Sequence, residues 1–156
     1  MSKNEDFFQV IGHISVFFST LDFMTSVLIT KLIISNEKSR FKDNTTLTQK
    51  FRIIEDYKEH EVSNIDILNE LKEFMPEAIE ISKKRNRFIH DQWIFRPENI
   101  EIGKIERAMV IGLEGNKTQL ETFNHSLEDL YQLLNEIGSI QKKVGALLGR
   151  LELAFG

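Results

Sequence analysis

The residues best suited to chemistry form one string near the middle of the chain. Residues 83–93 read Lys-Lys-Arg-Asn-Arg-Phe-Ile-His-Asp-Gln-Trp. Plotted as a helix, Arg85 points into the middle of the apolar side, and Asn86 and His90 lie toward its edge. A guanidinium aimed at a core is costly unless it is paired or kept for a purpose. Because imidazole titrates near neutral pH, the string indicates proton transfer by His90, with Asn86 orienting the imidazole or sharing its ligand.

A purely structural role for the same residues is also consistent with the sequence. Asp22, on a preceding apolar segment, is a candidate partner for Arg85, and His90 could cap the end of its helix. Trp93 is better explained as a packing aromatic than as a platform for stacking bases. The two readings differ in whether Arg85 and His90 reach an open surface.

The arrangement Arg85, Asn86 and His90 resembles the HEPN superfamily, helical domains in which Arg, usually a polar residue such as Asn, and then His occur near the end of a helix. The resemblance implies a homodimer in which two such helices meet and form a composite cleft from two Arg–His pairs. Many members cleave RNA without metal. Where small members often have Gly after the His, this chain has Asp91, which places a carboxylate beside the imidazole.

The implied function is metal-independent endoribonuclease activity with catalytic residues Arg85, Asn86 and His90. His90 would move protons during attack of the 2′-hydroxyl on the phosphate, and Arg85 would stabilise the added negative charge. Flanking RNA backbone would be held by four nearby cations, unless these simply form a solvated face: Lys83, Lys84, Arg87 and Arg96.

The resemblance also implies a toxin, stress or phage-defence setting with a cognate antitoxin or associated defence protein. In one toxin branch a Tyr two residues after the His is adenylylated by its partner; here that position is Gln92. The alternatives are a noncatalytic HEPN-like module that binds nucleotide, RNA or a partner protein, and a structural helical dimer whose polar pair only fixes register.

Apolar periodicity predicts the helices that position this string. A wide apolar face covers residues 7–32, and Thr46 to Gln49 form a capping box that opens a second helix through about residue 58. Ser63 or Asn64 caps a third ending at Met75. Pro76 suits the first turn of a fourth, spanning about residues 77–92. Residues 35–44 are expected to form a loop.

A change of pattern after Trp93 predicts a small β-hairpin. Its strands would include residues 100–102, 108–113 and 118–123, although residues 105–111 could also be helical. Ser126 starts a last helix, whose Gly138, Gly145 and Gly149 could pack against small residues of the first. The expected fold is a single domain over residues 1–156, an up-and-down bundle of four to five helices with a hairpin insert before the C-terminal helix.

Composition limits the remaining possibilities. The 156 residues are 41% hydrophobic and 28% charged, with a net charge of −4 and no cysteine, which excludes thiolate sites and a bulk polycation. The histidines lack the spacing of a metal site, and no phosphate-binding glycine loop occurs, so we expect no metal and no cofactor. Polar and charged residues interrupt the apolar segment of residues 7–34, which predicts a cytoplasmic protein without a membrane span.

Overall fold

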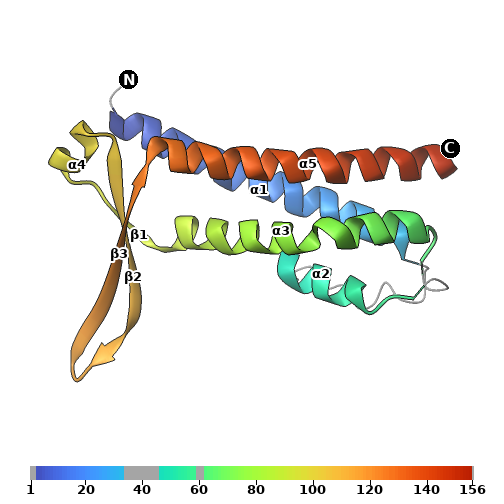
Figure 1. Cartoon of the computed structure of the whole chain (residues 1–156), viewed down its shortest axis with the longest axis horizontal. Coiled ribbons are helices and arrows are strands. Elements are labelled where there is room, and N and C mark those ends of the chain that lie inside the picture. Colours follow the sequence, from blue (N-terminus) through green and yellow to red (C-terminus); the bar gives the residue numbers. More distant parts are fainter. Residues whose placement is uncertain (1–2, 34–45, 59–61, 156) are drawn as a thin grey trace.

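The computed structural model describes residues 3–33, 46–58 and 62–155 and is mainly helical. Three long helices lie side by side: α1 (Lys3–Leu32), α3 (Ile65–His90) and α5 (Leu127–Phe155), with α3 running opposite to the other two (Figure 1). The shorter α2 (Leu47–Glu55) packs against α3. The predicted loop at residues 35–44 lies outside the described residues.

The predicted helix starts depend on side-chain caps, and the structure confirms them. Thr46 Oγ1 accepts from the Gln49 amide at 3.2 Å, and Gln49 Oε1 accepts from the Thr46 amide at 2.9 Å. Asn64 is the N-cap of α3. Ser126 and Asp129 exchange the same pair of bonds at the start of α5. These bonds satisfy amides that have no partner within the helix.

The prediction of separate third and fourth helices was wrong, because α3 continues through Pro76 as one helix. Proline normally disfavours a helix interior because it lacks an N–H and crowds the preceding turn. Here Leu71, Met75 and Ala78, on both sides of Pro76, are all buried on one face. Burial of this continuous apolar face offsets the local cost.

A three-stranded antiparallel sheet lies between α3 and α5 in the sequence. Its strands are β1 (Gln92–Ile94), β2 (Lys104–Glu114) and β3 (Lys117–Ser126), in the order β1-β2-β3. The predicted hairpin is therefore confirmed as β2 and β3, with Gly115 at φ +62° in the turn. The hairpin projects away from the helices (Figure 1).

Two details of this region differ from the prediction. Residues 100–102 do not form a strand: Ile100 lies in the short helix α4 (Pro97–Glu101), which Pro97 starts by fixing a helical φ. The helical alternative for residues 105–111 was also wrong. The first strand, β1, was not foreseen; its Trp93 indole donates to the Phe88 carbonyl at 2.6 Å and ties the sheet to the end of α3.

The core joins apolar side chains from α1, α2, α3 and α5. The predicted packing of the three α5 glycines against the small residues of α1 is not seen: only Gly145 of the three lies close to α1, and its neighbour there is Met24. A Cβ built on Gly145 would lie 3.3 Å from Met24 Cε of α1, whereas Gly12, Gly138 and Gly149 face open space. Gly145 therefore allows α5 to approach α1 at Met24.

The outer side of α1 exposes large apolar side chains. Phe23 is 70% exposed and Val16 61%, and Phe8 and Phe17 are also exposed. Residues 5–32 of α1 are long and apolar enough to cross a membrane, with an 18-residue window of mean hydropathy 1.4. Core helices of soluble proteins pass the same test, and the opposite side of α1 is buried in the core.

Candidate functional site

Arg85 lies where the sequence placed it, on the side of α3 that faces α1. Its Cζ is 4.7 Å from the centroid of the Phe18 ring, and its Nη1 donates to Asn86 Oδ1 at 3.0 Å. Its Nε is buried and has no hydrogen-bond partner among the described residues. A buried donor without a partner is unusual in a folded protein and calls for an explanation.

Asp22 is not the direct partner of Arg85 that the sequence suggested. Its carboxylate is 2.8 Å from Nζ of the buried Lys50, which also donates to Ser26 Oγ at 2.6 Å. Burial lowers the pKa of Arg85 from its usual value, and the nearby Asp22 carboxylate opposes this shift. Asp22 therefore acts on Arg85 only through its charge. The physical reason is that Lys50 needs a carboxylate more, because it is almost fully buried.

His90 is the last residue of α3 and is exposed. It lines an open depression of about 560 Å³ with Asn86. Lys83, Lys84 and Arg87 line the same depression, so the structure brings five of the predicted site residues together. Arg85 is not part of this lining, but it reaches it through its bond to Asn86.

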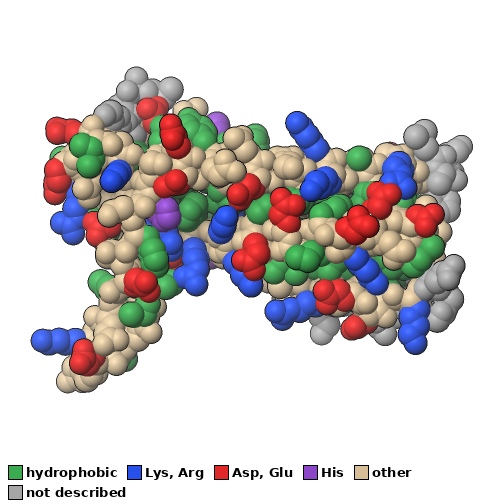
Figure 2. Space-filling model, viewed as in Figure 1, with side chains coloured by type: hydrophobic (Ala, Val, Ile, Leu, Met, Phe, Trp, Pro, Cys, Tyr) green, Lys and Arg blue, Asp and Glu red, His purple; other side chains and the backbone are tan. Residues whose placement is uncertain are grey.

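Basic side chains gather on α3 near the base of the hairpin (Figure 2). Lys83 pairs with Glu80 at 3.0 Å, and Lys84 lies 3.5 Å from Glu136. Arg87 contacts the Met109 sulfur and has no carboxylate partner in the described part of the chain. Arg96 lies apart from this group, because Glu106 holds its Nε at 2.8 Å.

The Asp91 carboxylate does not pair with His90, although Asp91 follows His90 in the sequence. Its carboxylate binds Nη1 of Arg107, a residue of β2 that is only 5% exposed. The Arg107 guanidinium lies over the rings of Phe88 and Phe123, with its Cζ 5.5 Å and 4.5 Å from their centroids. Arg107 therefore anchors the sheet to α3 with its charge paired.

Arg107 also contacts His125, which the sequence analysis did not single out as a functional residue. Arg107 Nε donates to His125 Nε2 at 3.2 Å, so Nε2 is the acceptor and Nδ1 carries the proton. Burial, and then the charge of Arg107, lower the pKa of His125, while Asp129 opposes the shift. His125 is thus held neutral. One signal could have revealed the pair. Ile105 and Arg107 are two residues apart in β2, so they share a face of the strand, and the apolar Ile105 marks that face as buried.

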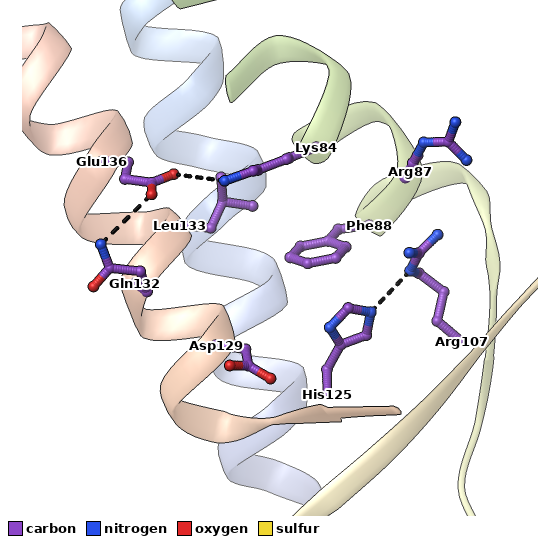
Figure 3. A pocket seen from close by; sticks show the side chains of 9 residues that line it. All are labelled: Lys84, Arg87, Phe88, Arg107, His125, Asp129, Gln132, Leu133 and Glu136. Carbon is purple, nitrogen blue, oxygen red and sulfur yellow. Dashed lines mark hydrogen bonds and ion pairs between the residues drawn. The ribbon is translucent and has the colours of Figure 1, made fainter. Parts of the chain in front are cut away.

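A second depression, which we call the α3–α5 pocket, lies beside this pair and has a volume of about 290 Å³ (Figure 3). Phe88 and Leu133 supply its apolar surface, and Lys84 and Arg87 line both depressions. Within the residues that the structure describes, no group of three or more His, Asp or Glu side chains is placed to hold a metal ion.

Comparison of the chain with protein-family models, curated proteins and solved structures found no match.

Proposed function

We propose that the protein is a metal-independent endoribonuclease of HEPN type that acts as a cytoplasmic homodimer, with Arg85, Asn86 and His90 as catalytic residues. The observation that carries this proposal is the arrangement at the end of α3. A half-buried guanidinium with an unpaired Nε is bonded to Asn86. Asn86 shares an open depression with His90, and three cations line it together with Glu80 and Asp91.

These groups are sufficient for cleavage by the neighbouring 2′-hydroxyl. His90 as the neutral base takes the 2′-hydroxyl proton while the 2′-oxygen bonds to phosphorus and the bond from phosphorus to the 5′-oxygen breaks. Arg85 stabilises the charge that develops on the phosphoryl oxygens. The departing 5′-oxygen receives a proton from the protonated His90 of a second copy of the chain. The products are a 2′,3′-cyclic phosphate and a 5′-hydroxyl.

The homodimer is supported by apolar side chains that a single copy leaves in water. They occur on the outer side of α1 and on the projecting hairpin, where Leu113 is 72% exposed and Val110 64%. Large exposed apolar patches are typical of surfaces that bind another protein. RNA binding is supported by Lys83, Lys84 and Arg87 around His90. A toxin or phage-defence setting, with an antitoxin or defence partner, follows from the HEPN resemblance.

The test is RNA cleavage by purified protein in excess EDTA. We expect wild type to cleave single-stranded RNA and His90→Ala to be slower by about 10²-fold or more. Arg85→Met should lose cleavage as well. Its free energy of unfolding should nevertheless stay within about 1 kcal/mol of wild type, because a half-buried guanidinium lacking a full set of partners contributes little to stability. The control is Lys142→Ala, at an exposed position of α5 that lines neither depression.

Equal cleavage by His90→Ala and Lys142→Ala would contradict the proposal. Intact RNA with every protein, together with RNA binding that Arg85→Met weakens, would instead identify a noncatalytic RNA-binding module.

A further inference from the structure

The α3–α5 pocket combines an aromatic wall with hydrogen-bonding groups (Figure 3). The Phe88 and His125 rings meet edge to face with centroids 4.9 Å apart, and Leu133 adds apolar surface. A volume of about 290 Å³ is near the lower end of the range for small-ligand sites, which matches one nucleotide unit rather than a larger cofactor.

His125 presents a hydrogen-bond donor to this pocket. Its Nε2 is occupied by Arg107, so the Nδ1–H is free, and no partner for it occurs among the described residues. Figure 3 shows this side of the ring turned toward the pocket and away from Arg107. Asp129 and Gln132 add an acceptor and an amide from α5. Aromatic surface with a few fixed donors and acceptors is how proteins bind an unstacked base.

The rim provides cations for a phosphate. Lys84 and Arg87 line both this pocket and the depression that contains Asn86 and His90. Arg87 is not paired with a carboxylate in the part of the chain that is described. A base inside the pocket would therefore place its phosphate near Lys84 and Arg87, which also line the depression that contains His90.

We propose that the α3–α5 pocket is a nucleotide subsite: it takes one base of single-stranded RNA against Phe88 and His125, with the attached phosphate on Arg87 and Lys84. Its role as a subsite rests on the proposed ribonuclease function. Binding of a nucleotide there does not, because neither Arg85 nor His90 lines the pocket.

The chain contains its own reporter for this pocket. Trp93 is the single tryptophan, and its ring centroid is 5.6 Å from that of Phe88 and 5.9 Å from that of His125. The four ribonucleoside monophosphates are titrated against the whole protein by calorimetry and by Trp93 fluorescence, excited at the red edge where nucleotides do not absorb. We expect saturable binding of the nucleotides with a change in Trp93 fluorescence. Ribose 5-phosphate, which lacks the base, should bind about tenfold more weakly or change the fluorescence less.

Two exposed positions of α5 give a matched pair of variants. Gln132→Phe fills the pocket from its rim and should weaken nucleotide binding by about tenfold or more. Asn135→Phe adds the same ring outside the pocket and should bind like wild type.

Absence of saturable binding, binding that leaves Trp93 fluorescence unchanged, or equal binding by both variants would overturn the pocket while leaving ribonuclease activity to be judged by the EDTA assay. Nucleotide binding without RNA cleavage would support the pocket and refute the proposed enzyme.

Discussion

Two arginine–histidine pairs lie near the end of α3, and their surroundings differ. Arg107 binds Asp91 and His125, is almost fully buried and stacks on aromatic rings. Arg85 also lies over an aromatic ring, that of Phe18, but among the described residues its only side-chain hydrogen bond is to Asn86, and its Nε is unpaired. The exposed His90 has no side-chain partner in the same part of the chain. The first pair is therefore satisfied within the fold, and the second is not.

The difference separates a structural role from a functional one. Buried polar groups that are fully bonded hold elements together, as Arg107 joins β2 to the end of α3. Groups that remain unsatisfied in the free protein are available to a ligand. This contrast is the basis for proposing Arg85 and His90 as catalytic residues and Arg107 as a structural anchor, with His125 presenting one free donor to the α3–α5 pocket.

The largest effect on stability is expected for Arg107→Ala. It would leave the Asp91 carboxylate, which is mostly buried, without its cation, and we expect a loss of about 3 kcal/mol in the free energy of unfolding, measured with urea. Arg96→Ala removes an exposed pair with Glu106 and should cost less than about 1 kcal/mol. Equal losses would show that Arg107 does not anchor the sheet.

A smaller loss is expected for Asp22→Asn, which tests the surroundings of the unsatisfied pair. The buried Lys50 would lose its carboxylate but keep Ser26, so the unfolding free energy should fall by about 1–2 kcal/mol in chemical denaturation. RNA cleavage by the folded variant should stay close to wild type. Loss of cleavage without loss of stability would instead make Asp22 part of the catalytic site.

The smallest effect is a pH dependence of stability from His125. Because its pKa is lowered in the folded protein, the unfolded chain binds a proton more readily below its own pKa of about 6.5. This contribution is complete above that pH and is lost as pH falls through it. In urea unfolding at a series of pH values, His125→Asn should therefore lose less stability on acidification than wild type. Identical slopes for wild type and His125→Asn would contradict a neutral, half-buried His125.

The helices, and the grouping of the residues that we propose as catalytic at the end of α3, could be predicted because their signals are local. Apolar periodicity gave α1 and α5, and the caps at Thr46 and Asn64 marked the starts of α2 and α3. The continuation of α3 through Pro76 could not be predicted, since it depends on apolar burial by other elements on both sides of the proline.

The partners of the charged side chains were also beyond the sequence. Asp91 follows His90 but binds Arg107, 16 residues away, and Asp22 binds Lys50 across 28 residues. Such choices depend on how deeply each cation is buried in the folded chain. The α3–α5 pocket likewise depends on how β2, β3 and α5 pack against α3, which the sequence does not show.

The most direct measurement is the chemical identity of the RNA ends that wild-type protein produces in EDTA. Attack by the 2′-hydroxyl, with His90 moving the proton and Arg85 on the phosphate, predicts 2′,3′-cyclic phosphate and 5′-hydroxyl ends, which His90→Ala should not generate. The proposed mechanism would be contradicted by ends bearing 3′-hydroxyl and 5′-phosphate groups, by cleavage that needs a divalent cation, or by RNA that stays intact.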